Sequence, residues 1–276
     1  MTVEPNVGNP PSPKTRGMVN SPLKLFLFTL PLAASCAVPS ADIIPRYGQF
    51  DLDGHFGVNA GGTTNGVNDL ASAGFGDDDG FFGLRADLDF GSPMVTLSSQ
   101  VTSHKGSGVT TEGLDTADGS IGPGTNVYSD MDFGLHQAMF TFDVVPTDSV
   151  DVGIGLGFAY INVDATMMDM GAGQVSVDES IVIPQLAIHA GVDLGDFEAV
   201  GLLSGFDLSS SGDQVTFIDL DLLARYRLIG GDDRVEGSIG FGYRATTLDL
   251  KYEDDGDDID AEFRFQGPYV TLILSL

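Results

Sequence analysis

The sequence predicts an all-β protein, a closed antiparallel up-and-down transmembrane β-barrel of about ten strands. Three observations predict this fold. From about Arg46 to Leu276, segments in which every second residue is apolar alternate with stretches rich in Gly, Asp, Ser, Thr and Asn. Two is the period of a β-strand, and an apolar face opposite a polar face is typical of strands that separate lipid from a lumen. The connections between segments are alternately short and long, which is also typical of such barrels.

In most segments, apolar and polar or small residues alternate without interruption. In segment 150–160, for example, Ile154 and Leu156 alternate with Gly153 and Gly155. The strand count falls to eight if the third and fourth segments do not both span the membrane. Segments carrying the pattern are 47–58, 82–90, 95–104, 131–145, 150–160, 185–193, 200–208, 218–228, 235–244 and 263–276. Long connections are expected at 60–80, 105–130 and 163–179, all on the same side.

Apolar residues are expected on the outer face throughout. In the first segment this puts Phe50 and Leu52 outside and Asp51 and Asp53 inside, and in the seventh it puts Leu202 outside. Aromatic residues near strand ends are expected to form girdles at the membrane surfaces; they are Tyr47, Phe90, Tyr160, Tyr226 and Tyr269.

Two segments change parity. In the fourth, Phe133 lies on the opposite parity from Phe140, which predicts a β-bulge near 136–138. In the tenth, Phe265 and Val270 differ in the same way, which predicts a switch at Gly267 and Pro268.

The N-terminus predicts export. Lys24 precedes the apolar run 25–34, and small residues follow it, which is the order of a secretory signal peptide over residues 1–35. Met18 is an alternative start. We expect residues 36–45 to form a short periplasmic segment and 46–276 the barrel. The single cysteine, Cys36, lies at the cleavage point, so either lipidation of Cys36 or ordinary cleavage nearby fits the sequence.

Composition excludes some functions. The formal net charge is −28, which disfavours a nucleic-acid partner because phosphate binding needs clustered Lys and Arg. Hydrophobic residues make up 42% of the chain, which is not the composition of a disordered protein. No motif for a cofactor is present.

The C-terminal residues 267–276 (GPYVTLILSL) end the chain inside an alternating segment. With the strand pattern of 46–276, this end resembles the bacterial outer-membrane β-barrel proteins of the small OmpA-like and porin-like type, although their last residue is usually Phe and here is Leu276. The resemblance implies an outer-membrane location. It also implies contact with outer-membrane lipid and lipopolysaccharide, and recognition by the barrel assembly machinery.

Charged residues on the polar faces are expected to pair across the lumen, because an unpaired buried charge costs several kcal/mol. The predicted network comprises Asp51, Asp53, Arg85, Asp87, Asp89, Asp219, Asp221, Arg225, Arg227, Glu236, Arg244 and Arg264. Glycines on the same faces are expected to leave space inside; they are Gly153, Gly155, Gly157, Gly240 and Gly242. Two interpretations stay open, a narrow charged pore and a salt-bridged plug, and the plug or a very narrow conduit is favoured.

Two acidic stretches, 77–79 and 253–258, have the oxygen ligands that divalent cations prefer, but their spacing does not match a calcium loop. We therefore expect diffuse bridging of Ca²⁺ or Mg²⁺ to anionic lipid rather than an ordered metal site.

The expected function is a structural or surface-contact role, with narrow passive passage of small solutes left open. We expect no enzyme activity and assign no catalytic residues. One alternative is an omptin-like protease or other outer-membrane enzyme, because some ten-stranded barrels of this kind use acidic and His residues at the outer rim; the candidates are His55, His104, His136 and Asp132. Another is a soluble secreted β-sandwich or lipocalin-like binding protein, whose strands also alternate.

Overall fold

The computed structural model describes residues 40–60, 66–76, 79–116, 119–145, 147, 149–171, 173–210, 213–230, 235–254 and 257–276. The predicted signal peptide, 1–35, and Cys36 lie outside the described residues. No helix among the described residues is long and apolar enough to cross a membrane.

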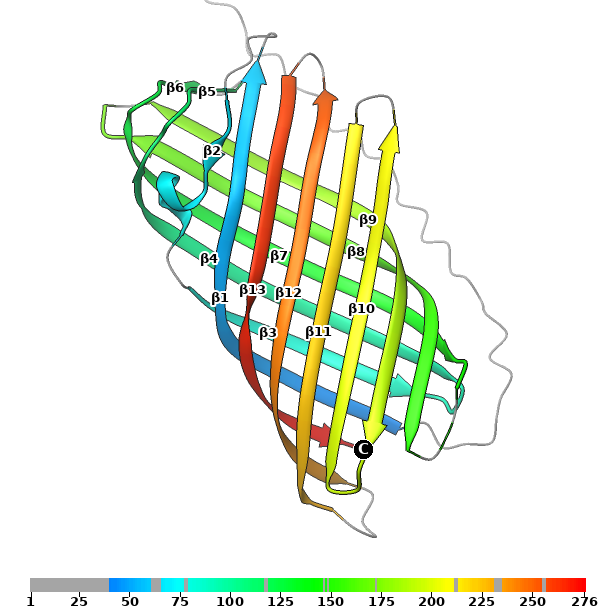
Figure 1. The fold of residues 1–276 in the computed structure, drawn as a ribbon. Coiled ribbons are helices and arrows are strands. Elements are labelled where there is room, and N and C mark those ends of the chain that lie inside the picture. Colours follow the sequence, from blue (N-terminus) through cyan, green and yellow to red (C-terminus); the bar gives the residue numbers. More distant parts are fainter. Residues whose placement is uncertain are drawn as a thin grey trace, which may run out of the picture. The chain divides into compact units, whose positions relative to one another are not determined.

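Ten long strands form one closed antiparallel barrel (Figure 1). Each strand pairs with the next in chain order, and β13 pairs with β1 over the whole length of both to close the barrel. The fold-class prediction is confirmed. The strands are β1 (Ser40–Ala60), β3 (Asp79–Asp89), β4 (Pro93–Val109), β7 (Asn126–Asp143), β8 (Val150–Asp169), β9 (Gln174–Asp193), β10 (Phe197–Ser210), β11 (Asp213–Ile229), β12 (Glu236–Asp254) and β13 (Asp257–Ser275).

The two ends of the barrel differ. One end, which we call the termini end, holds Ser40, Leu276 and the described residues of the short connections, 90–92, 144–145, 147, 149, 194–196, 230 and 235. The other, which we call the cap end, carries β2 (Asn68–Asp69), the short π-helical turn η1 (Ala71–Phe75), β5 (Leu114–Thr116) and β6 (Gly119–Ile121) (Figure 1).

The strands reach further than the sequence pattern predicts. β1 begins at Ser40 and is paired with β3 and β13 from its first residues, so 40–45 belongs to the barrel rather than to a separate periplasmic segment. The expected loop 163–179 is mostly strand, because β8 continues to Asp169 and β9 starts at Gln174. Strand pairing continues here because it satisfies the backbone N–H and C=O groups. This pairing does not require apolar side chains at alternate positions.

Aliphatic and aromatic side chains form an apolar belt on the outside of the barrel. Leu156 is 65% exposed, Leu186 67% and Leu272 66%. A soluble sandwich would bury these rows against a second sheet. The outward position of the belt therefore decides against the soluble alternative and fits a barrel in lipid. Further members are Phe82, Leu84, Leu97, Val101, Ile154, Phe158, Val182, Ile188, Leu203, Ile218, Leu222, Ile239, Phe241 and Val270.

Beyond the belt, towards the cap end, the two faces exchange character. Phe50 and Leu52 are buried in the interior, at 0% and 5% exposure, and Asp51 and Asp53 are exposed on the outer wall. The predicted faces of the first segment are therefore wrong. This part of β1 lies past the belt, so its outer face meets water and carries carboxylates, while its inner face packs in an apolar core.

The same exchange explains both parity changes. β7 pairs with β4 and β8 without a register shift, so the predicted bulge near 136–138 is absent. Phe133 is buried inside and Phe142 is exposed outside on one regular strand. β13 is equally regular past Gly267 and Pro268, with Phe265 inside and Val270 outside. The environment changes along these strands, and the register does not.

Candidate functional site in the barrel lumen

A hydrogen-bonded cluster centred on Arg244 crosses the middle of the lumen. Arg244 on β12 donates through Nε to Asp219 Oδ1 and through Nη2 to Asp219 Oδ2, at 2.9 Å each. It also donates to the amide oxygens of Gln100 on β4 at 2.8 Å and Gln137 on β7 at 2.6 Å. Thr246 completes the shell with a 2.7 Å hydrogen bond to Asp219. Arg244 and Asp219 are each 2% exposed in their side chains, so this pair is sealed from solvent.

A second cluster surrounds Asp221, two residues along the same face of β11. Its Oδ2 accepts from Arg46 Nη2 at 2.5 Å and Arg85 Nη1 at 3.2 Å, and its Oδ1 accepts from the Tyr269 hydroxyl at 2.6 Å. The Arg46 guanidinium also lies 5.0 Å from the centroid of the Tyr269 ring. Arg85 turns its Nε to Asp87 at 2.8 Å. These contacts tie β1, β3 and β13 to β11 across the lumen.

We call the two clusters together the midplane network. Its members are almost fully buried, and a buried charge is tolerated only where a partner and hydrogen bonds compensate the loss of hydration. Among the described side chains, three buried donors in or beside the network lack a partner: Arg46 Nε, Gln100 Nε2 and Gln185 Nε2. The rest of the network fills the cross-section with paired groups.

Glycines facing the lumen do not leave open space. A Cβ on Gly242 would lie 2.1 Å from Cζ of Tyr269, and one on Gly153 would lie 2.0 Å from Cε1 of His189. Each ring therefore occupies the place that a side chain at the glycine would take. The expectation that these glycines leave space inside is therefore wrong at Gly153 and Gly242, where a ring from an adjacent strand occupies the room.

The cap end is closed by apolar packing. Leu70, Phe75, Leu114 and Ile121 from the connecting segments are 1–3% exposed and belong to the same core as the inward residues of the strands. Asn68 joins the two connections: its Oδ1 accepts from the backbone nitrogens of residues 111 and 112 at 2.9 and 3.0 Å, and its Nδ2 donates to the backbone oxygen of residue 112 at 3.3 Å.

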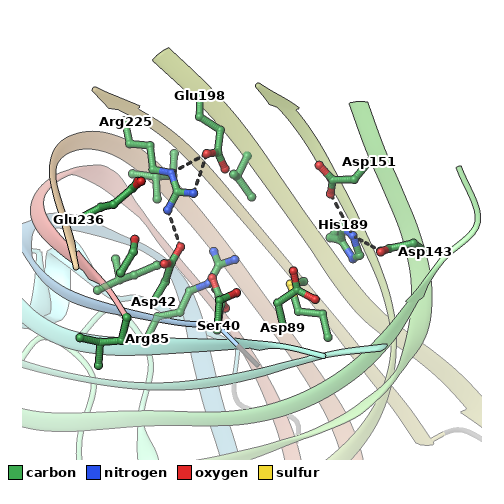
Figure 2. A pocket seen from close by; sticks show the side chains of 17 residues that line it. Ser40, Asp42, Arg85, Asp89, Asp143, Asp151, His189, Glu198, Arg225 and Glu236 are labelled. Carbon is green, nitrogen blue, oxygen red and sulfur yellow. Dashed lines mark hydrogen bonds and ion pairs between the residues drawn. The ribbon is translucent and has the colours of Figure 1, made fainter. Parts of the chain in front are cut away.

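The termini end holds a cavity of about 520 Å³ below the midplane network (Figure 2). Seven carboxylate residues line it: Asp42, Asp87, Asp89, Asp143, Asp151, Glu198 and Glu236. The cationic side chains in its wall are Arg85, Arg225 and, when protonated, His189. Ile44, Val200 and Leu223 add apolar surface between them.

Two ion-paired groups lie in this wall (Figure 2). Arg225 contacts Asp42 across the β1–β13 closure and contacts Glu198 at 2.6 Å. His189 is held by three neighbours: its Nε2 lies 3.0 Å from Asp143 and 3.1 Å from Asp151, and its Nδ1 lies 3.0 Å from the hydroxyl of Thr141. His189 is therefore a packed, hydrogen-bonded histidine of the lumen wall.

The outer wall at the cap end is polar and charged. Lys105 contacts Asp130 at 2.8 Å, and that hydrogen bond raises the pKa of Lys105. Asp260 accepts from Lys251 at 2.8 Å and lies 3.3 Å from His55, and these contacts lower the pKa of Asp260, the Lys251 hydrogen bond most. Such pairs are solvated, so each contributes little to stability.

The structure divides the predicted lumen residues into three sets. Arg85, Asp87, Asp219, Asp221 and Arg244 lie in the midplane network or against it. Asp89, Arg225 and Glu236 line the cavity, and Arg227 contacts Glu236 at 3.0 Å beside it. Asp51, Asp53 and Arg264 lie on the outer wall, so their lumenal assignment is wrong; Arg264 contacts Glu262 there.

Important lumen residues were missed by the sequence prediction. Arg46 and Asp42 precede the first predicted segment, and they share the parity of Phe50 and Leu52, which the prediction placed outside. Gln100 and Gln137 are uncharged, so a search for opposite charges passes over them. Tyr269 was expected in an outer girdle but is 1% exposed and hydrogen-bonded to Asp221. Its parity on β13 is the signal that could have placed it inside.

The two acidic stretches lie largely outside the described residues. Residues 77–78 and 255–256 lie outside the described residues, as do the side chains of 79, 253–254 and 257–258. In the part of the chain that is described, no group of three or more His, Cys, Asp or Glu side chains is arranged to hold a metal ion.

Comparison with known proteins identifies the fold. No protein-family model and no curated protein matches the chain. Among solved structures, the outer membrane protease OmpT from Escherichia coli is similar with a TM-score of 0.53 and 10% identity, over 85% of this chain and 96% of that one. The transport unit of the autotransporter AIDA-I from Escherichia coli has a TM-score of 0.36 and 9% identity, over 91% and 93%. Only the first likeness has a TM-score above 0.5, and at 10% identity it shows the fold alone. The chain therefore has the fold of the bacterial outer-membrane β-barrel proteins, a closed barrel with an apolar outer belt.

Proposed function

We propose that the protein is a sealed outer-membrane barrel with a structural or surface-contact role. The observation that carries this proposal is the midplane network. In it, Arg244 and Asp221 each bind several partners from different strands across the lumen. Paired charges of this kind cannot separate to admit a solute without leaving a buried charge alone, which costs about 3–5 kcal/mol.

The cap end supports the same proposal. Leu70, Phe75, Leu114 and Ile121 bury apolar surface against the inward face of the strands. A hydrated solute would have to displace this packing before reaching the network. Two consecutive barriers of different chemistry, one apolar and one ionic, favour a closed lumen.

The surface-contact part of the proposal is supported by the outer wall beyond the belt. The strands continue past the lipid-facing rows and present charged residues to water, among them Asp51, Asp53, Lys105 and Arg264. We propose that this wall contacts lipopolysaccharide head groups through divalent cations, and that the residues 267–276 are read by the assembly machinery during insertion.

We propose no enzyme activity. The candidate residues for a protease are dispersed: His104 is buried between Thr102 and the ring of Phe265, and His136 lies on the outer wall against Tyr160. His55 pairs with Asp260 and Glu262 on the outer face. The two cavities at the termini end are lined by none of these histidines. A general base needs a substrate within hydrogen-bond reach, which these positions do not favour.

A narrow passage for small solutes is a second candidate, favoured by one observation. The unpartnered donors Arg46 Nε, Gln100 Nε2 and Gln185 Nε2 are places where water can bind inside the lumen. Water at these donors would give a thin polar path through an otherwise filled section.

Planar-bilayer recording of the purified, refolded protein tests the proposal. A sealed barrel gives no discrete current steps, and steps of uniform size from the unaltered protein would overturn it in favour of the passage. Arg244→Ala combined with Asp219→Ala removes both charges of one pair and is expected to produce conductance. Heat-modifiable migration in detergent, measured for each sample, shows that the barrel is folded.

A further inference from the structure

We propose that the cavity at the termini end binds a small organic polycation of the polyamine class. Its volume of about 520 Å³ lies in the range of small-molecule sites, about 300–1,000 Å³. The midplane network closes its inner side, so a ligand enters only from the termini end, which faces the periplasm in barrels with this arrangement of short turns. The proposal goes beyond the sealed-barrel function and does not rest on it.

Charge in the wall selects a cation. Seven carboxylate residues face two arginines and one histidine. Arg85 is also shared with Asp221, which belongs to the midplane network and not to the cavity wall. The cavity therefore has an excess of negative charge in a confined space between low-dielectric walls, where the field of the carboxylates is focused on whatever enters.

The excess is concentrated on one side of the cavity. On the other side, Arg225 forms ion pairs with Asp42 and Glu198. Around His189, one imidazole serves both Asp143 and Asp151. Asp89 belongs to the same wall, and among the described residues its side chain accepts only a backbone hydrogen bond, from Gly91 at 2.7 Å. Its carboxylate has no cationic partner in the described chain and is drawn without one in Figure 2.

The arrangement of the carboxylates indicates an organic cation rather than a metal ion. No three or more His, Cys, Asp or Glu side chains of the described chain converge closely enough to coordinate a metal. The acidic groups are instead distributed over strands β1, β3, β7, β8, β10 and β12, with Ile44, Val200 and Leu223 between them. Ammonium groups joined by methylene chains match charges that are spread apart with apolar surface between them.

Isothermal titration of spermidine into the full-length refolded protein in detergent tests this inference. We expect saturable binding that weakens as salt is raised. Asp89→Asn and Asp151→Asn are each expected to weaken binding by about tenfold, since each removes a charge that would face an ammonium group. Magnesium at equal charge concentration is expected to compete poorly.

The matched controls are Asp51→Asn and Asp53→Asn, which remove the same charge from the outer wall at the opposite end. They should leave spermidine affinity within about twofold if the site is local. Absence of saturable binding, equal losses in the outer-wall variants, or full competition by magnesium would each overturn the inference. Asp89 is exposed, so its variant is expected to fold, and heat-modifiable migration verifies this for every sample.

Discussion

How much a charged residue contributes to the stability of this barrel depends on its position along the barrel axis and on the face of the strand that carries it. Asp53 and Asp221 both occur in alternating segments, yet Asp221 is buried between two guanidinium groups and Asp53 is solvated. Periodicity identifies the face of a strand, but it does not identify what surrounds that face. The two residues therefore provide a direct experimental comparison.

Asp221→Asn is expected to lower the free energy of unfolding by about 3–5 kcal/mol, because Arg46 and Arg85 lose a buried counter-charge. Asp53→Asn, with the same change on the outer wall, should stay within about 0.5 kcal/mol. The chain contains no Trp, so denaturant unfolding in lipid vesicles is followed by circular dichroism and gel mobility. Equal effects of the two variants would contradict the assignment of Asp221 to a buried network.

Gly242→Ala is expected to destabilise the barrel by about 1–3 kcal/mol, because the added Cβ would overlap the Tyr269 ring, whose Cζ is 2.1 Å away. Gly237→Ala is the control on the same strand, since its nearest neighbour is Ile229 Cβ at an ordinary 3.8 Å. The same unfolding measurement applies. If both variants are as stable as the unaltered protein, the absence of a side chain at Gly242 is not required to accommodate the Tyr269 ring.

At the level of the element, each strand passes through two environments. Towards the termini end its outer face meets lipid and its inner face meets polar groups, whereas towards the cap end the outer face meets water and the inner face meets an apolar core. β7 and β13 show this most directly, because one unbroken register carries both patterns. The sequence pattern of a parity change can thus arise without any bulge.

The cap is an element whose stability can be separated from that of the barrel. Asn68→Ala removes the hydrogen bonds to residues 111 and 112. We expect faster proteolysis within 66–76 and 110–125 while the barrel keeps its heat-modifiable migration, because the strand pairing is unaffected. Ser120→Ala, at an exposed position on β6, is the control. Unchanged cleavage rates in Asn68→Ala would show that apolar packing alone holds the cap.

For the whole molecule, the orientation of the apolar rows is testable in lipid. With Cys36 replaced by Ser, Leu156→Cys should react slowly with a water-soluble maleimide in vesicles, because its outward side chain meets hydrocarbon. Asp53→Cys should react quickly because it meets water. Comparable rates at the two positions would argue against a lipid-facing belt.

Much of this architecture could be predicted because a strand in lipid needs apolar residues at every second position, on its outward face. The outward rows of β8, β9, β11 and β12 alternate with polar residues and small ones, and they were placed correctly. The inner face of β10 was not: Leu202 is 3% exposed and faces inward beside Met139 and Ala187. An aliphatic residue is compatible with lipid and with an apolar interior, so alternation alone cannot distinguish them.

The sequence by itself determined the strand period, the antiparallel order and the presence of a lipid-facing surface, because each depends on neighbours along the chain. Only the tertiary structure decided which charges meet, where the lumen is filled and where a cavity remains. Arg46 meets Asp221 because closure of β13 on β1 brings the ends of the barrel sheet together. Contacts of this range depend on the tilt and register of all the strands, which no local pattern encodes.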